Sequence, residues 1–209
     1  HWANVLLQED SLSAALAIAY RGLQAIVNPE PFWYFMGLAF SRNNEYDSAA
    51  VWLDKAWRAD TTDGRIQFSL AAALERSGRF GEAASLFSDL LAREPTNAAA
   101  LNYLGYMYAD SGVHLQESLT MIERALDQDP NNGAYLDSFG WILYRLGRYD
   151  EAEVQIRRAL EILQSDATIF DHLGDILAAR GRQQEAIENW RRALELDPEN
   201  EDLQRKLLE

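Results

Sequence analysis

The chain has 209 residues, no cysteine, and 19 basic (Lys and Arg) against 33 acidic (Asp and Glu) side chains, which leaves a net charge of −14. This acidic excess argues against nucleic acids and anionic membrane surfaces as partners, because both attract clustered basic groups. It is compatible with a basic protein partner, although acidity often serves solubility alone. Without cysteine the chain has no disulfide or thiolate chemistry, and no apolar run approaches the roughly 18 residues of a membrane span.

The first 29 residues are predicted to hold an incomplete copy of the unit that recurs from residue 30 onward. Its second helix is expected near residues 12–26, with Ala15 at a small position. Trp2, Leu6 and Leu7 give this end an apolar face that another copy of the chain could cover. His1 is not an initiator residue, and no leader with a charged and then an apolar region follows it. We therefore interpret the chain as a fragment or a processed product.

From residue 30 onward, small residues recur at fixed positions every 34 or 35 residues. One series falls within the first predicted helix of each unit, and another falls in the second. Only Gly or Ala lets a neighbouring helix approach closely there, and the large apolar residues between them supply the ridges that helix packing needs. The first series is Gly37, Ala71, Gly105, Gly140 and Gly174, and the second is Ala49, Ala83, Ser118, Ala152 and Ala186.

Residues 133–166 show the unit most clearly. They contain two amphipathic helical patterns with i, i+3, i+4, i+7 spacing, which is typical of helices that bury one stripe. The stripes are Leu136, Phe139, Gly140 and Leu143 in the first helix, and Tyr149, Ala152, Ile156 and Ala159 in the second. A helix pair this short cannot bury its stripes alone, so it needs copies of itself on either side.

Turn residues separate the predicted helices. Residues that tolerate a left-handed backbone are expected to end the first helices: Asn44, Gly78, Gly112, Gly147 and Gly181. Prolines are expected to end three second helices, each followed by polar residues that can cap the next helix: Pro95, Pro130 and Pro198. The third unit has one extra residue in its turn, near residues 113–115.

These units resemble the tetratricopeptide repeat over nearly the whole chain. The resemblance implies an all-α fold, a right-handed α-solenoid of stacked antiparallel helix pairs. We predict one array over residues 1–209, with a truncated repeat at 1–29 and full repeats at 30–63, 64–97, 98–132, 133–166 and 167–200. Residues 201–209 are expected to begin a capping helix, whose Leu203, Leu207 and Leu208 cover the last apolar face.

Two phrases also resemble a set of bacterial tetratricopeptide proteins, some of which are envelope lipoproteins that act as adaptors. The phrases are LNYLGYMYAD and NNGAYLDSFGWILYRLGRYDEA. This narrower resemblance covers about the C-terminal half of the chain and favours a bacterial scaffold. The compartment stays open between the periplasm or envelope and the cytoplasm, because a signal or anchor could have been cut away.

The resemblance also implies that the first helices line an inner, concave wall that binds a protein or peptide. We expect Trp141, Tyr106 and Tyr144 to be the main contacts, because large rigid aromatic residues dominate interface energetics. The alternative is that they pack sideways on the neighbouring first helix. The full predicted set is Tyr34, Leu38, Arg42, Arg65, Phe68, Glu75, Arg76, Asn102, Tyr106, Asp110, Asp137, Trp141, Tyr144, Arg145, Asp171 and Asp175.

Asp137, Asp171 and Asp175 lie at related places of two successive first helices. One interpretation is a pocket for a Lys or Arg of a partner. The other, which we favour from sequence, is a solvated face that Arg145 partly neutralises. A clamp for a carboxylate terminus, as some tetratricopeptide proteins have, is not expected, because no basic residue stands at the fifth place of any repeat.

No enzyme, metal or cofactor is expected. The chain has no HExxH, GxSxG or phosphate-binding GxxxxGK[ST] motif. A lone histidine such as His172 is interpreted as structural or solvated. Carboxylates are interpreted as solubilising charge or as i, i+4 partners of Arg, as in Glu153 with Arg157 and Glu188 with Arg192.

The sequence therefore predicts a non-enzymatic adaptor that binds a protein segment in its groove. The alternatives are a self-assembly module, which would form a homo-oligomer, and the repeat segment of a larger enzyme. The remaining tryptophans are assigned mainly to packing between helices: Trp33, Trp52, Trp57 and Trp190.

Overall fold

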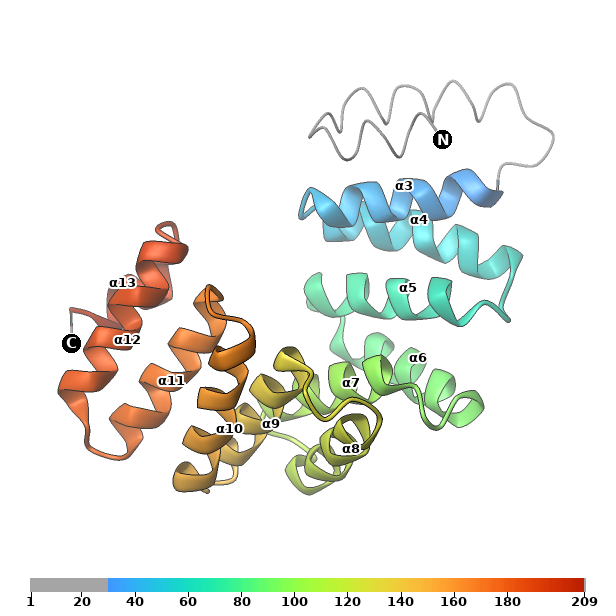
Figure 1. The fold of residues 1–209 in the computed structure, drawn as a ribbon. Helices are drawn as coiled ribbons and strands as arrows, with labels where there is room; N and C mark the ends of the chain where they lie inside the picture. Colours follow the sequence, from blue (N-terminus) through green and yellow to red (C-terminus); the bar gives the residue numbers. More distant parts are fainter. Residues whose placement is uncertain (1–29, 209) are drawn as a thin grey trace. The chain divides into compact units, whose positions relative to one another are not determined.

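The computed structural model of the chain describes residues 30–208, and each regular element in that range is an α-helix (Figure 1). This confirms the predicted all-α class. The chain divides into two compact units, residues 1–95 and 96–209. The predicted truncated repeat, with Ala15, Trp2, Leu6 and Leu7, lies outside the described residues. The repeat boundaries, and the treatment of the whole chain as one array, stay predictions.

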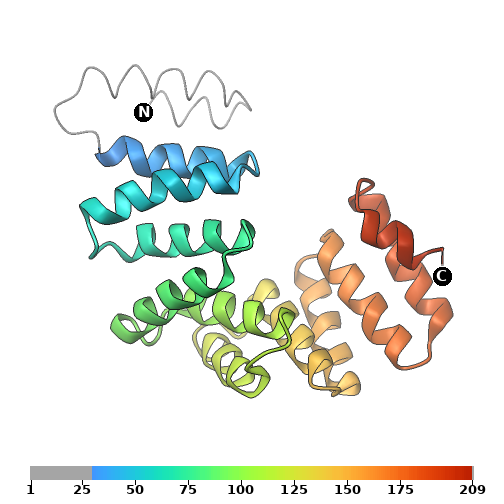
Figure 2. The ribbon, with the colours of Figure 1, turned by 180° about the vertical axis from the view of Figure 1, so that it is seen from behind.

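The first unit contains two described helix pairs, which Figures 1 and 2 show from opposite sides. They are α3 (Glu30–Arg42) with α4 (Tyr46–Ala59), and α5 (Gly64–Arg76) with α6 (Phe80–Arg93). Met36, Leu53, Phe87 and Leu90 are fully buried between them. Each helix of a pair packs on the other, and α4 also packs on α5, so the two pairs stack.

The second unit contains three helix pairs and a short last helix. The pairs are α7 (Ala98–Asp110) with α8 (Leu115–Gln128), α9 (Gly133–Arg145) with α10 (Tyr149–Ile162), and α11 (Ala167–Ala179) with α12 (Gln183–Leu196). The last helix is α13 (Glu201–Lys206), which packs on α12. The first helix of the middle pair, α9, contacts both α7 and α11, so the first helices form one continuous face within this unit.

The small residues stand where the helices approach most closely. All ten members of the two predicted series are buried. A Cβ atom added to Gly174 would lie 2.4 Å from the Trp190 ring, and one added to Gly140 would lie 2.5 Å from Ile156. The predicted role of these positions, to let the second helix approach the first, is therefore confirmed.

The predicted turns are confirmed as well. Asn44 and the four turn glycines have positive φ values between 59° and 79°. The connection between α7 and α8 holds one residue more than the corresponding connections of the other pairs, and His114 there takes a left-handed conformation with φ 50°. Side chains of Asn97, Asn132 and Asn200 accept hydrogen bonds from the backbone of the helices that they precede, as the polar residues after each proline predicted.

Two predicted packing positions are wrong. Tyr149 is 37% exposed, because it is the first residue of α10 and its ring turns to Tyr144 on α9, at 5.7 Å between centroids. Leu208 is 87% exposed and lies two residues beyond the end of α13 at Lys206. Only Leu203, which is 1% exposed, is buried as a cap should be.

Candidate functional site: an aromatic and acidic pocket on the second unit

A pocket of about 340 Å³ lies beside the first helices of the second unit. Tyr106 of α7, Trp141 of α9, and Asp171, His172 and Asp175 of α11 line it, and α13 closes it with Lys206. We call this site the aromatic–acidic pocket. Its volume lies at the lower end of the range of ligand sites, which suits one or two side chains of a partner rather than a whole domain.

The aromatic side of the pocket is a stack of rings. The Trp141 ring stacks on His172, with centroids 4.2 Å apart and planes at 20°, and its Tyr144 neighbour lies 5.0 Å away at 26°. Tyr106 lies 6.2 Å from the His172 ring. Trp141, Tyr106 and Tyr144 are each half-buried. Trp141 and Tyr106 therefore contact His172 on another first helix, as the alternative held, and both also line the pocket. The Tyr144 ring instead lies against Trp141 of its own helix and Tyr149 of α10.

Trp141 carries an unusual polar atom. Among the described residues, its Nε1 is one of two buried side-chain atoms without a hydrogen-bond partner, the other being Asn102 Oδ1. A buried donor without an acceptor costs about 1–3 kcal/mol. The Arg145 guanidinium lies 5.8 Å from the centre of the Trp141 ring, and its Nη1 donates to the carbonyl oxygen of Asp110 at 2.5 Å. The indole N–H is thus buried without an acceptor in this arrangement of side chains.

His172, one of the stacked rings, also forms a buried ionic pair with Asp137. His172 Nδ1 is 2.8 Å from Asp137 Oδ1, and the two residues are 5% and 8% exposed. Burial by itself would lower the pKa of His172, but the charge of Asp137, the hydrogen bond to it, and the charges of Asp171 and Asp175 hold that pKa above its ordinary value of 6.5. The expectation that Asp137 faces the groove is therefore wrong, because its carboxylate turns inward to His172.

The two other carboxylates have a partner that was not predicted. Lys206 Nζ donates to Asp171 Oδ1 at 2.6 Å and to Asp175 Oδ1 at 2.7 Å. The prediction that Arg145 neutralises this face is wrong, since Arg145 contacts Asp110 instead. Burial raises the pKa of Asp171, which the hydrogen bond from Lys206 only partly offsets. Burial would lower the pKa of Lys206, but its two carboxylate partners raise it.

A signal for these pairs was present in the sequence. The fifth place of one repeat meets the sixth place of the next, 35 residues further on. Asp137 meets His172 and Asp171 meets Lys206 in this way, and in the first unit Tyr34 Oη lies 3.4 Å from Ser69 Oγ. Reading pairs at that spacing would have found both ionic contacts.

The predicted groove residues of the first unit are placed as follows. Tyr34, Leu38 and Phe68 are half-buried, and Phe68 packs its edge on Phe87 at 5.4 Å. Arg42 and Arg76 are exposed, and the Arg76 guanidinium lies over the Tyr46 ring at 5.0 Å. Their role in binding stays a prediction.

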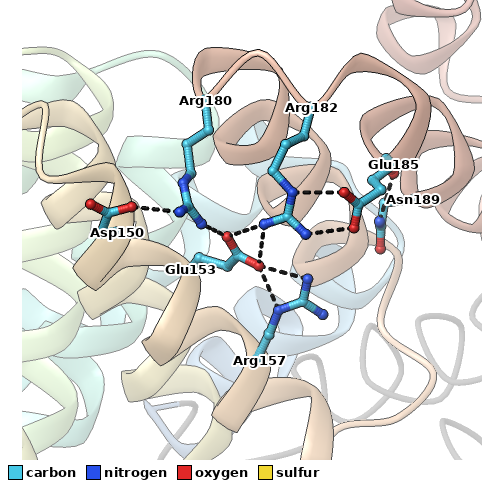
Figure 3. Close-up of polar contacts among 7 residues, drawn as sticks. All are labelled: Asp150, Glu153, Arg157, Arg180, Arg182, Glu185 and Asn189. Atoms are coloured by element: carbon cyan, nitrogen blue, oxygen red, sulfur yellow. Dashed lines mark hydrogen bonds and ion pairs between the residues drawn. The ribbon is translucent and has the colours of Figure 1, made fainter.

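A second cluster of charges lies away from the pocket and joins α10 to the turn before α12. Figure 3 shows Glu153 between three guanidinium groups, those of Arg157, Arg180 and Arg182. Arg182 Nη1 donates to both Glu153 oxygens, at 2.9 and 2.8 Å, and also reaches Glu185. The predicted i, i+4 pair of Glu153 with Arg157 is confirmed, and the Glu153 side chain is only 9% exposed. The predicted pair of Glu188 with Arg192 is wrong, since Arg192 pairs with Glu195.

Replacing Glu153 by Gln should destabilise the second unit by about 1–3 kcal/mol, because three cations lose their shared carboxylate. Glu151→Gln is the matched control, since Glu151 is exposed and pairs only with Arg148 among the described residues. Denaturant titration followed by circular dichroism measures both changes. Equal, small effects of the two substitutions would contradict a structural role for the Glu153 cluster.

Neither a metal site nor a membrane helix is found in the part of the chain that the structure describes. No three His, Asp or Glu side chains gather there in a metal-binding arrangement. None of the helices between residues 30 and 208 has the length and apolar character of a bilayer span.

Comparison with known proteins identifies the repeats. Two family models described as tetratricopeptide repeat match residues 64–107 and 96–165, and one described as TPR repeat matches residues 174–207. The chain is therefore a member of the tetratricopeptide repeat family. The repeats and the fold support a protein-interaction scaffold in general, and such folds are typically non-catalytic.

Among curated proteins, the TPR repeat-containing protein PA4667 of Pseudomonas aeruginosa is 32% identical over 115 residues. The match covers 55% of this chain and 20% of that protein, so the chain spans about a fifth of the length of that relative. Among solved structures, the thermophilic TPR protein TTC0263 of Thermus thermophilus has a TM-score of 0.75 at 22% identity, covering 86% of this chain and 97% of that one. MamA from Desulfovibrio magneticus has a TM-score of 0.64 at 15% identity, covering 81% and 95%. These structural likenesses concern the fold alone.

Proposed function

We propose that the chain is a non-enzymatic adaptor and that its aromatic–acidic pocket binds an extended segment of a partner protein. The observation that carries this proposal is the state of Trp141. Its ring lines a pocket of about 340 Å³, and its buried Nε1 has no acceptor among the described residues. If the indole turns toward the pocket on binding, a peptide carbonyl of the bound segment supplies the missing acceptor and removes the cost of the unpaired donor.

The surroundings of Trp141 support this role. Its ring stacks with both His172 and Tyr144, so little side-chain entropy is lost when it contacts a partner. Rigid aromatic residues of this kind are the usual hot spots of interfaces. A stack of helices offers a stiff surface, so the partner segment rather than the scaffold orders on binding.

A peptide array tests the proposal without knowledge of the natural partner. The intact chain is probed against immobilised peptides of varied charge and apolarity, and the strongest binders are titrated in solution by fluorescence anisotropy. Trp141→Ala with Tyr106→Ala should weaken binding by about 30-fold, the effect of losing a hot spot of about 2 kcal/mol. Phe80→Ala is the matched control, because this aromatic side chain is 49% exposed and lies in the first unit.

Thermal melting by circular dichroism checks that each variant is folded. The single change Trp141→Phe adds a finer test, since it keeps a stacking ring but removes the indole N–H, and it should weaken binding less than Trp141→Ala. Peptides that bind the double variant as tightly as the unaltered chain would place the binding surface elsewhere and refute the proposal.

A further inference from the structure

We infer that the site between Asp171 and Asp175 binds a basic side chain of the partner, and that Lys206 of α13 fills this site when no partner is bound. A Lys or Arg of the bound segment then displaces Lys206. The inference rests on the proposed function and adds to it both the chemistry of the partner and a competing group within the chain itself.

The geometry shows that the pocket already binds a cation. Lys206 Nζ lies within 2.7 Å of one oxygen from each carboxylate. Its ammonium group also lies 5.8 Å from the centre of the Trp190 ring, within the range of a cation–π contact. Two carboxylates and a ring face around one ammonium group form the kind of site that recognises Lys or Arg side chains.

One of the two carboxylates is held in place independently of Lys206. Trp190 Nε1 donates to Asp175 Oδ1 at 3.0 Å, and Trp190 is 6% exposed and fixed against Gly174. Asp175 therefore stays aimed at the cation position when Lys206 leaves, and an incoming cation meets a preformed acceptor. This preorganisation lowers the free-energy cost of binding.

The charge balance of the pocket requires a cation in that position. Lys206 is the one Lys or Arg among the described residues that line it, His172 in the same lining pairs with Asp137, and five aspartates line the same space. Asp171 and Asp175 are partly buried, with side chains 23% and 16% exposed. If Lys206 withdrew and no other cation took its place, the Asp171 and Asp175 carboxylates would lie close together without a positive charge between them. That arrangement is unfavourable at low solvent exposure. A basic residue of the partner offsets that cost, and a neutral residue does not.

The helix that carries Lys206 is held at few points. Helix α13 is six residues long, and within it only Leu203 is buried, while Lys206 is half-buried. The other four side chains of this helix are exposed. Releasing Lys206 thus requires breaking its two ionic contacts and its contact with the Trp190 ring, and rotating one flexible side chain, with Leu203 left in its place. An exchange of cations at this site does not require the repeats to unfold.

The experiment uses a blocked peptide of about five residues with one central arginine, and its neutral citrulline counterpart, titrated into the intact chain. Lys206→Met removes the competing ammonium group and keeps an apolar stem. If Lys206 fills the site more than nine-tenths of the time, this change should tighten binding of the arginine peptide by at least 10-fold. Binding of the citrulline peptide should not change, and added salt should reduce the gain.

Arg205→Met is the matched control, because it removes one positive charge from the same helix, and the Arg205 side chain is 73% exposed. This variant should bind the arginine peptide within about twofold of the unaltered chain, since screened surface charges contribute little. Asp171→Asn with Asp175→Asn should abolish the gain that Lys206→Met produces.

Equal affinities of the Lys206→Met and Arg205→Met variants would overturn the inference. So would a lower melting temperature of Lys206→Met with no tighter binding, which is the result expected if Lys206 only anchors α13. The proposed function fails in a different way, through peptide binding that is indifferent to Trp141 and Tyr106. Binding that depends on those two rings but not on Lys206 would leave the proposed function standing and refute the competition by α13.

Discussion

Replacing Asp137 by Ala should lower the free energy of unfolding of the second unit by about 3–5 kcal/mol, because the buried His172 would lose the carboxylate to which it is hydrogen-bonded. The partner carboxylate lies 2.8 Å away, and neither residue is more than 8% exposed. Asp127→Ala, at an exposed site on α8, is the matched control and should change stability by less than about 0.5 kcal/mol. Denaturant titration of both variants measures the difference.

The double change of Asp137 to Leu and His172 to Phe provides the complementary test. An apolar pair of similar size should recover much of the stability that Asp137→Ala loses, because a buried ion pair is often replaceable as a unit but not by halves. If Asp137→Ala and Asp127→Ala cost the same, His172 is neutral or solvated, and the buried ionic pair is not what holds α9 to α11.

The same pair gives the stability a defined pH dependence. The pKa of His172 is raised in the folded state above its ordinary value of 6.5. The stabilisation is therefore complete below pH 6.5 and is lost as the pH rises through the raised folded pKa. Between about pH 6 and about pH 9, the free energy of unfolding should fall more for the unaltered chain than for His172→Gln. Parallel curves for the two proteins would contradict a charged His172.

Replacing Trp190 by Ala should cost the second unit about 3–5 kcal/mol, since it removes a large buried ring. The ring is 6% exposed, donates a hydrogen bond to Asp175, and rests on the bare backbone of Gly174. Gly174→Ala should cost about 1–3 kcal/mol in the unaltered chain, because the added Cβ would lie 2.4 Å from the ring. Thermal and denaturant unfolding measure both.

The two substitutions should not be additive. In the Trp190→Ala background the Cβ of Gly174→Ala meets an empty space, so the second change should cost much less there, as expected for residues in direct contact. Gly105→Ala is the matched control, because its Cβ would meet no atom closer than 3.3 Å. Additive effects at positions 174 and 190 would show that the contact between them does not limit how closely α12 approaches α11.

The fold could be predicted from sequence because its packing repeats. Gly140 and Ala152 are buried for the same reason as Gly174 and Ala186. Because the pattern recurs, each copy supports the helix assignments made for the other copies. Helix ends were equally readable, since Gly147 and Asn132 act through local backbone geometry and local hydrogen bonds. These features depend on residues close in sequence or on an arrangement that every repeat shares.

The candidate site was harder to predict because its contacts are particular to one place. The aromatic residues Trp141 and Tyr106 were expected on the inner wall, since large rings at inner positions are conspicuous in a repeat, and both line the pocket. The partners of the charges were not, because Asp137, Asp171 and Arg145 each had several residues within reach. Periodicity shows which helices are neighbours but not which of two nearby cations a carboxylate selects, and that choice depends on burial and side-chain reach.

The contact between the fifth place of one repeat and the sixth place of the next has a consequence for the evolution and engineering of this chain. The positions of the small and large packing residues recur in every hairpin, although the large residues differ in size, as Ile156 and Trp190 do. The ionic contacts are specific to particular hairpins, because Asp137 needs the hairpin with His172 to follow it, and Asp171 needs Lys206. A permutation of the hairpins would keep every helix but would leave a histidine and a carboxylate buried in the stack without their partners. The complementary charges therefore make the order of the hairpins along the chain matter.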